Sequence, residues 1–298
     1  MLLSACASSS SPAASVVSSP AGTSSPAASG AAASDWPDIS ADPVEPSASA
    51  PVFTPPPAAT LAPGAAGLVL HVPVLMYHRI VPPAQAGDSL PSLVVPPGLF
   101  AAQMAALASA GWHTITAAQL ASDLAAGVRP APRTFVITFD DGYDDGYTYA
   151  LPILQSHNFV ATYYVIAGRI GNPPGPLEAL TPAHVQALAA AGMEIGNHTY
   201  NHVDLATQSA SALSYQVLAA SARIEALVGI APRTLAYPFG EWDPAVAAEV
   251  ARAGMNLAFT TVEGAREAWP TRLASPRVRV GPGVTPADLL ALVERFSA

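Results

Sequence analysis

Short apolar runs alternate with helical segments from Leu68 onward, and this alternation is the feature that most limits the possible folds. The runs are rich in β-branched and aromatic residues with little polar alternation, as is typical of strands buried on both faces of a parallel sheet. They cover residues 72–78, 135–137, 159–166, 193–197, 234–237, 257–261 and 278–280. Strands separated by helices indicate βα units. Because there are about seven such units, we expect an α/β fold with a closed or nearly closed (β/α) barrel.

Capping residues mark several helix boundaries. Three segments begin with a capping residue followed by proline at the first turn, where proline is well tolerated. These starts are Thr181-Pro182, Asp243-Pro244 and Thr285-Pro286. Further helices are predicted over residues 100–110, 117–126, 147–156 and 209–228.

The first part of the chain has a different composition. Residues 7–66 are almost entirely Ala, Ser, Pro, Gly and Thr. Such a segment has too few large apolar groups to offset the entropy of the chain, and its prolines keep it extended. We therefore expect a disordered tether over residues 7–66, followed by one folded catalytic domain over residues 67–298.

The single cysteine, Cys6, cannot form an internal disulfide. It ends the tetrapeptide Leu3-Ser4-Ala5-Cys6, which resembles the lipobox at which bacterial lipoprotein signal peptides are cut and the cysteine is lipidated. A residual signal over residues 1–6 and a chance match in an Ala/Ser-rich tail both stay open, because the preceding segment is too short for a complete signal peptide. In the first case the true start lies upstream of Met1. The protein would then be extracytoplasmic, either lipid-anchored to the cell envelope or secreted.

The formal net charge is −9, and every basic residue is an arginine. None precedes Arg79, and no dense basic cluster follows it. Neutralising phosphates requires a concentrated positive face, so we expect no nucleic-acid partner. An acidic chain is repelled by anionic lipids, and no run is long and apolar enough to span a bilayer. We expect a monomer whose only tie to a membrane is the lipid on Cys6.

Two adjacent acids follow the strand at residues 135–137. Asp140 and Asp141 precede Gly142, which lets the chain turn sharply. Neighbouring side chains of an extended backbone point in different directions, so the acids suit different roles, one binding a metal and one moving a proton. A simple turn or helix cap is the ordinary alternative for this sequence. The second copy, Asp144-Asp145-Gly146, lacks a preceding strand and is expected to be a helix cap.

A histidine pair, His198 and His202, follows the strand at residues 193–197. If this segment takes a helical turn, both imidazoles lie on one face and can reach one ion. The spacing alone is weak evidence, but a barrel would bring the histidines and the aspartates to the same rim. Two imidazoles, one carboxylate and a water form the ligand set of a catalytic Zn²⁺, although Co²⁺ or Ni²⁺ would also fit.

Two of these segments resemble the first two motifs of the polysaccharide deacetylases, which are carbohydrate esterase family 4 or the NodB homology domain. The segments are Thr138-Phe139-Asp140-Asp141-Gly142 and His198-Thr199-Tyr200-Asn201-His202. Leu235-Ala236-Tyr237-Pro238-Phe239-Gly240 is similar to the third motif. The resemblance covers nearly the whole folded part. It implies a distorted (β/α) barrel, a divalent metal and hydrolysis of N-acetyl groups on sugar polymers.

By this resemblance Asp141, His198 and His202 match the metal ligands, and Asp140 matches the general base. The backbone N–H of Phe239 would donate to the tetrahedral oxyanion. These roles agree with the chemistry of the residues, because a metal-activated water needs a nearby carboxylate to take its proton.

The sequence departs from the family pattern at two places. Ala236 stands where an arginine commonly orients the base, and no histidine after His202 can serve as the general acid. The start Tyr77-His78-Arg79 is similar to a branch that includes deacetylases of biofilm poly-N-acetylglucosamine. We hypothesise that His78 supplies the acid and that Arg277 or Arg279 replaces the orienting arginine.

Four residues are candidates for binding the sugar. They are the aromatic residues Tyr237 and Trp242, which could stack on sugar rings, and the two arginines, Arg277 and Arg279. We expect a metal-dependent N-deacetylase of an extracytoplasmic polysaccharide containing N-acetylglucosamine, such as poly-N-acetylglucosamine, peptidoglycan or a chitin-like polymer. The alternatives are an O-acetyl esterase acting on xylan at the same site and a non-catalytic carbohydrate-binding relative.

Overall fold

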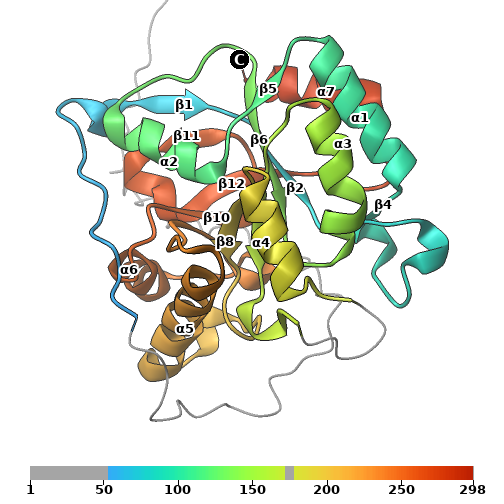
Figure 1. The fold of residues 1–298 in the computed structure, drawn as a ribbon. Helices are drawn as coiled ribbons and strands as arrows, with labels where there is room; N and C mark the ends of the chain where they lie inside the picture. The colour runs from blue at the N-terminus through green and yellow to red at the C-terminus, as the bar shows by residue number, and fades with distance from the viewer. Residues whose placement is uncertain (1–52, 172–177, 298) are drawn as a thin grey trace, which may run out of the picture. The chain divides into compact units, whose positions relative to one another are not determined.

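A ring of parallel strands forms the centre of the computed structural model, which describes residues 53–171 and 178–297 (Figure 1). The ring strands are β2 (Val74–Tyr77), β6 (Thr134–Phe139), β7 (Thr162–Val165), β8 (Glu194–Asn197), β9 (Thr234–Ala236), β10 (Leu257–Glu263) and β12 (Ser275–Arg279). Their order in space is β2-β12-β10-β9-β8-β7-β6, and β6 pairs again with β2. The predicted (β/α) barrel is therefore confirmed as a closed barrel.

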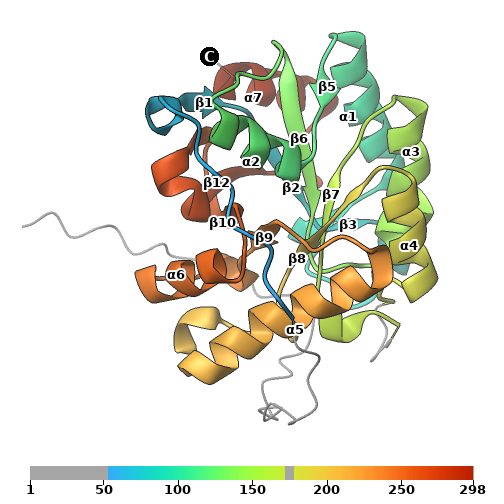
Figure 2. The same ribbon diagram turned by 60° about the vertical axis from the view of Figure 1, so that its left-hand side comes forward.

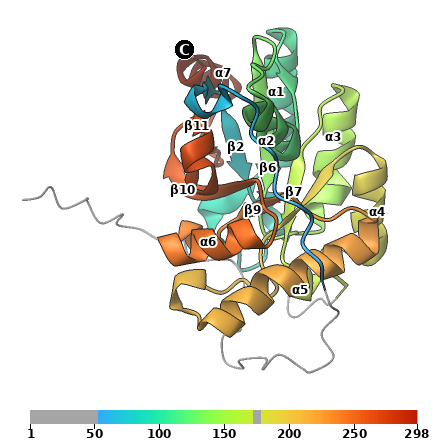
Figure 3. The same cartoon turned by 90° about the vertical axis from the view of Figure 1, so that its left-hand side faces the viewer.

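Helices surround this ring. They are α1 (Pro97–Ser109), α2 (Ala117–Ala126), α3 (Leu151–Ser156), α4 (Pro182–Ala190), α5 (Ala210–Val228), α6 (Pro244–Arg252) and α7 (Pro286–Phe296). α7, α1 and α3 follow one another around the outside, and α4, α5 and α6 do the same (Figures 2 and 3). The side chains of Thr181, Asp243 and Thr285 accept the predicted capping hydrogen bonds at the starts of α4, α6 and α7.

Side chains of the ring strands alternate between two layers of the core. Leu75 of β2 and Ile137 of β6 pack with residues of α1, α3, α4 and α7. Their neighbours Val74 and Val136 pack instead with residues from β7, β9 and β10, inside the barrel. Leu120 of α2 joins this inner cluster, so α2 closes one end of the barrel. Because both faces are apolar, each strand reads as a continuous hydrophobic run, as the sequence indicated.

Several short strands were not expected from the sequence. β1 (Val69–His71) pairs antiparallel with β11 (Arg266–Ala268). β3 (Arg79–Ile80) pairs with β4 (Val94–Val95), and β5 (His113–Thr114) extends the sheet beyond β6. Runs of two or three residues are too short to carry a periodic pattern, so only their pairing partners define them.

The folded body begins before residue 67. Hydrogen bonds join residues before this boundary to the rest of the folded body. Arg233 Nη1 donates to the carbonyl of Pro57 (2.8 Å), and the Ala59 amide donates to Asn256 Oδ1 (3.2 Å). The Ala62 amide donates to the carbonyl of Ala125 (2.8 Å). This differs from the tether predicted up to residue 66. Main-chain groups make most of these contacts, so they could not be predicted from a composition that lacks large apolar side chains.

The predicted lipobox and the rest of the tether lie in residues 1–52, outside the described residues. Across the described ranges, no helix combines the length and the apolar character needed to cross a membrane.

Candidate active site

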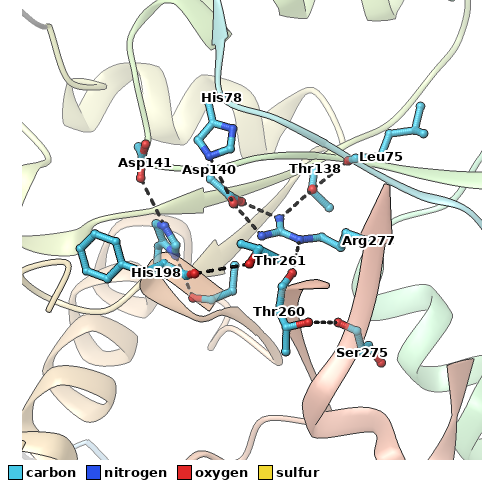
Figure 4. A network of polar contacts seen from close by, with 12 residues as sticks. Leu75, His78, Thr138, Asp140, Asp141, His198, Thr260, Thr261, Ser275 and Arg277 are labelled. Atoms are coloured by element: carbon cyan, nitrogen blue, oxygen red, sulfur yellow. Dashed lines mark hydrogen bonds and ion pairs between the residues drawn. The ribbon is translucent and has the colours of Figure 1, made fainter. Parts of the chain in front are cut away.

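The ends of β6 and β8 bring the three candidate metal ligands together. Oδ1 of Asp141 lies 3.3 Å from Nε2 of His198 and 3.3 Å from Nε2 of His202. All three ligand atoms lie within 4.8 Å of one another, and the side chains are almost completely buried. Figure 4 shows Asp141 pointing toward His198. The predicted grouping of an aspartate with a distant histidine pair is therefore present.

The two adjacent aspartates point to different partners, as predicted. The Asp140 amide still donates to the carbonyl of Tyr77 (3.0 Å), which continues the pairing of β6 with β2. Asp141 then takes a left-handed backbone conformation with φ of 72°, and Gly142 follows with the same φ. A Cβ on Gly142 would lie 3.3 Å from Val165, so glycine also fits the close approach to β7. This turn directs Asp141 to the histidines and Asp140 away from them.

The histidine pair does not adopt the helical turn that the spacing argument assumed. Thr199 and His202 both have positive φ, 67° and 59°, in an irregular turn. The Thr199 amide donates to Asn197 Oδ1 (2.7 Å), and the His202 amide donates to Thr199 Oγ1 (2.9 Å). These hydrogen bonds hold the turn in a conformation that residues other than glycine seldom adopt.

The donor set fits a divalent metal. The Nδ1–H of His198 donates to the carbonyl of Ala236 (2.8 Å), so the Nε2 lone pair is available to an ion. Burial lowers the pKa of His202 to about 4, which keeps its imidazole neutral at physiological pH. Burial would raise the pKa of Asp141, but hydrogen bonding to His198 and the charges of the histidines lower it, so the carboxylate is ionised. Two imidazoles and one carboxylate are the ligands that a catalytic zinc site uses.

Asp140 is held by a buried arginine. Arg277 donates from Nη1 to Oδ1 (2.8 Å) and from Nη2 to Oδ2 (2.7 Å), as Figure 4 shows. The same guanidinium reaches Thr138 Oγ1 (3.0 Å) and the carbonyl of Thr260 (3.1 Å). Burial favours the neutral acid, but the charge and hydrogen bonds of Arg277, with the nearby histidines, outweigh it and lower the pKa of Asp140. The carboxylate is therefore ionised and fixed in orientation.

This geometry decides between the two arginines. Arg277, from β12, makes the contact with Asp140 that the orienting arginine was predicted to make. The prediction that Arg277 binds substrate is wrong, because Arg277 is 1% exposed. Its guanidinium already donates to Asp140, Thr138 and Thr260. Arg279 lies two residues further along β12 and lines the pocket. It is partly exposed, and its side chain makes no hydrogen bond or ion pair with any described residue.

His78 approaches the same carboxylate from the end of β2. Its Nε2 lies 4.0 Å from Asp140 Oδ2, beyond hydrogen-bonding distance, and its side chain is 12% exposed (Figure 4). Burial lowers the pKa of His78, although the negative charges of Asp140 and Asp141 partly oppose this. The predicted acid thus lies beside the predicted base and the candidate metal ligands.

These residues surround one pocket at the rim where the strands end. Its lining residues are His78, Leu93, Asp140, Asp141, His198, His202, Tyr237, Phe239, Thr261 and Arg279. Tyr237 is 1% exposed and donates from its hydroxyl to the carbonyl of Leu273 (2.9 Å). Its ring stacks on Trp242 with 6.4 Å between the ring centres, and Trp242 is 40% exposed. Of the two aromatic residues predicted to contact the sugar, Trp242 thus has a ring exposed to solvent, and the buried Tyr237 ring packs against it.

The bend at Pro238–Gly240 is fixed by its surroundings. Phe239 has φ of 60°, and its ring centre lies 4.8 Å from that of His202. Thr261 Oγ1 donates to the Phe239 carbonyl (3.3 Å). A Cβ on Gly240 would lie 2.3 Å from Thr261 Oγ1, so only glycine fits there. The main chain of Phe239 is therefore held rigidly at the edge of the pocket.

Other contributions were not visible in the sequence. Thr138 and the carbonyl of Ala236 orient Arg277 and His198, yet neither residue type signals such a role. The Asp144-Asp145-Gly146 segment lies at the start of a helical segment, with Asp145 at the N-cap position, but the predicted capping contact is not made. The Asp145 side chain makes no capping hydrogen bond and instead forms an ion pair with Arg79.

Comparison with known proteins agrees with this site. Residues 127–258 match the family model described as polysaccharide deacetylase. YxkH of Bacillus subtilis, a polysaccharide deacetylase by name, is 28% identical over 223 residues, which cover 75% of this chain and 76% of YxkH. The structure of the Streptococcus pyogenes deacetylase PplD in complex with acetate superposes with a TM-score of 0.67 and 27% identity, covering 74% of this chain and 96% of PplD.

A further solved structure shares the fold. IcaB from Ammonifex degensii superposes with a TM-score of 0.64 and 23% identity, over 76% of this chain and 97% of IcaB. The family model spans the strand that carries Asp140 and Asp141 and the turn that carries both histidines. In a family-model match over part of the chain, in a curated relative and in its fold, the chain is similar to polysaccharide deacetylases.

Proposed function

We propose that the protein removes N-acetyl groups from a polysaccharide containing N-acetylglucosamine. The observation that carries the proposal is an ionised, arginine-held Asp140 directly beside the grouped Asp141, His198 and His202. Two relatives support the substrate class. They are a chitooligosaccharide deacetylase of Bradyrhizobium, 32% identical over 133 residues, and a peptidoglycan-N-acetylglucosamine deacetylase of Bacillus cereus, 32% identical over 106 residues. Poly-N-acetylglucosamine, peptidoglycan and chitin-like polymers are the candidate substrates.

Asp141, His198 and His202 would hold the metal, with Zn²⁺ as the proposed ion and Co²⁺ or Ni²⁺ as alternatives. A bound divalent ion supplies a Lewis acid that polarises the acetyl carbonyl and makes a water more acidic. Arg279 and Trp242 lie at the pocket or beside its wall, and we assign them to contacts with the sugar.

The protein groups then move two protons. Asp140 takes a proton from the attacking water as its oxygen bonds to the acetyl carbon. The backbone N–H of Phe239 donates to the oxyanion that forms, an interaction typically worth about 3 kcal/mol in the transition state. The carbon–nitrogen bond breaks while His78 gives its proton to the leaving nitrogen. The products are acetate and a free amine, and the proton that Asp140 took from the water passes to His78, directly or through solvent, which restores the proton that His78 gave up.

Acetate release tests this proposal. The zinc-loaded protein should release acetate from β-linked N-acetylglucosamine oligomers, and Asp140→Asn should slow release by about 10²–10⁴-fold, the usual contribution of a positioned acid or base. His78→Ala should also slow it if His78 is the acid. Metal content measured on each variant separates loss of chemistry from loss of the ion. A wild-type protein that binds zinc but releases no acetate from any oligomer contradicts the proposal.

An O-acetyl esterase could use the same groups, because ester hydrolysis forms the same oxyanion. An ester has a better leaving group, so it depends less on His78. A panel of β-1,6 and chitin oligomers, peptidoglycan and acetylxylan would rank the substrates. Preference for acetylxylan would favour the esterase, and binding without turnover would favour a non-catalytic relative.

We further propose that the protein acts outside the cytoplasm as a monomer, tied to the cell envelope by a lipid on Cys6. The resemblance of residues 3–6 to a lipobox supports this location. Intact-mass measurement of protein from the membrane fraction tests it. An unmodified Cys6 on soluble protein contradicts the lipid anchor.

A further inference from the structure

His78 is held by main-chain pairing on the side that precedes it. Tyr77, its neighbour in β2, pairs with Phe139 of β6, and its carbonyl accepts the Asp140 amide at 3.0 Å. The residue before the proposed acid is thus bonded directly to the proposed base. This contact is part of the barrel itself.

The residues that follow His78 are held by one carboxylate. Asp145 accepts the Ile80 amide at Oδ1 (2.9 Å) and Arg79 Nε at Oδ2 (2.8 Å). Both residues of β3 are therefore bonded to Asp145, which lies in the turn that carries Asp140 and Asp141. The backbone of His78 is joined to this turn on both sides.

The ion pair between Arg79 and Asp145 is buried, and Arg79 has further partners. Arg79 is 5% exposed and Asp145 is 6% exposed. Arg79 Nη1 also donates to the carbonyl of Ala86 (2.9 Å) and to Ser89 Oγ, and its guanidinium carbon lies 4.6 Å from the centre of the Tyr143 ring. A guanidinium with this many fixed partners has little freedom to move, so it sets the direction in which the chain leaves His78.

We propose that the Arg79–Asp145 pair is a positioning device that sets the His78 imidazole against the leaving nitrogen. This inference rests on the proposed function and on His78 as the acid. The imidazole already lies 4.0 Å from Asp140 Oδ2, so a small rotation of the backbone at residue 78 changes its reach toward the substrate. A misplacement of about 1 Å can slow a reaction by up to about 100-fold.

A purely stabilising ion pair would behave differently. An amide nitrogen is a poor leaving group and needs a proton as the bond breaks, whereas 4-nitrophenolate leaves without one. Displacing His78 should therefore slow release of acetate from a sugar amide much more than hydrolysis of 4-nitrophenyl acetate. General disruption of the fold or of the metal ligands would slow both reactions together.

The test compares Asp145→Asn and Arg79→Gln with the wild type, each as the zinc-loaded full chain. For acetate release from an N-acetylglucosamine oligomer, kcat should fall by about 10–100-fold with little change in KM. Hydrolysis of 4-nitrophenyl acetate should fall by much less. In a His78→Ala background, Asp145→Asn should cause almost no further loss on the sugar, because coupled residues are not additive.

Val185→Ala is the matched control for stability, since Val185 is a fully buried core residue of α4 that lines no part of the pocket. It should lower Tm without changing the ratio of amide to ester rates. If Asp145→Asn does not fold, Arg79→Lys, which keeps the charge, carries the same comparison. Equal losses on both substrates, or additive losses with His78→Ala, would overturn the inference. A wild type without activity on any sugar would instead overturn the proposed function, and this inference with it.

Discussion

Two pairs of buried carboxyl groups, at opposite ends of the barrel, have pKa values shifted in opposite directions. At the rim that carries the pocket, Asp140 and Asp141 lie among Arg277 and the histidines, and their pKa values are lowered. At the other end, Glu194 begins β8 and Glu267 lies on β11, beside β1. Burial raises the pKa values of both glutamates, that of Glu267 to about 8.

Their hydrogen bonds explain the difference. Glu194 accepts from the hydroxyls of Thr162 and Thr234 and from the Ala118 amide, all at the starts of neighbouring elements. No arginine or histidine among the described residues forms an ion pair with Glu267. The neutral donors around Glu194 do not outweigh the effect of burial, whereas Arg277 and the histidines around the two aspartates do. Groups that carry or can take a positive charge therefore surround the two aspartates of the pocket and not the two glutamates.

The largest expected effect comes from a ligand at the rim. Asp141→Ala should abolish zinc binding and lower activity on both sugar amides and 4-nitrophenyl acetate by on the order of 10³-fold, more than the roughly 10–100-fold typical of residues behind the ligands. Zinc content and both rates measure this. Glu194→Gln, at the opposite end, is the control and should keep its zinc. Full zinc binding by Asp141→Ala would contradict the proposal that Asp141 is a metal ligand.

The next largest effect concerns the base. In Arg277→Met, Asp140 stays buried without its cation, so burial should raise its pKa above the ordinary 3.8. We expect about a 100-fold loss of kcat at neutral pH and an acid limb of the pH–rate profile moved to higher pH.

Arg277→Met should also reduce stability by about 3–5 kcal/mol, because an unpaired charge remains buried. Arg295→Met is the control, since Arg295 is exposed and its ion pair with Glu263 lies at the surface. An unmoved acid limb in Arg277→Met would show that some other group keeps Asp140 ionised.

The smallest effect on activity is expected at the closed end, where Glu267→Gln should leave kcat unchanged. The pKa of Glu267 is raised from 4.5 to about 8, so the folded state holds a proton that the unfolded chain releases between these values. Wild-type stability should therefore fall as pH rises through this window, by at most roughly 1.4 kcal/mol per pH unit. Urea unfolding across the window should show a shallower fall in Glu267→Gln.

Glu263→Gln is the control for this pH dependence, because the Glu263 side chain is 66% exposed. It should keep the wild-type slope. An equally steep slope in Glu267→Gln would mean that Glu267 is not the group that titrates.

The features that could be predicted from the sequence are those encoded locally. α2 runs over residues 117–126 as predicted, and the Thr–Pro and Asp–Pro starts mark their helices because the capping residue lies within the same turn. The grouping of Asp141 with His198 and His202 followed from two strand ends sharing one rim. Features set by distant pairing were not predictable in the same way.

Arg277 illustrates the limit. Its contact with Asp140 depends on β12 pairing with β2 and on β2 pairing with β6, and no local pattern gives those registers. The conformations of Thr199 and His202 were missed for another reason. Left-handed residues other than glycine have only a weak sequence signature, so the turn was assigned by spacing alone.

The closure of the ring has a consequence for biosynthesis. β2 is the first ring strand to leave the ribosome, and one of its edges pairs with β6. Its other edge pairs with β12, which is the last ring strand to be synthesised. Arg277 arrives with β12 and reaches Asp140 only then. A nascent or truncated chain that lacks β12 carries both aspartates and both histidines without their arginine, so the arginine-held form of Asp140 exists only after β12 has been synthesised.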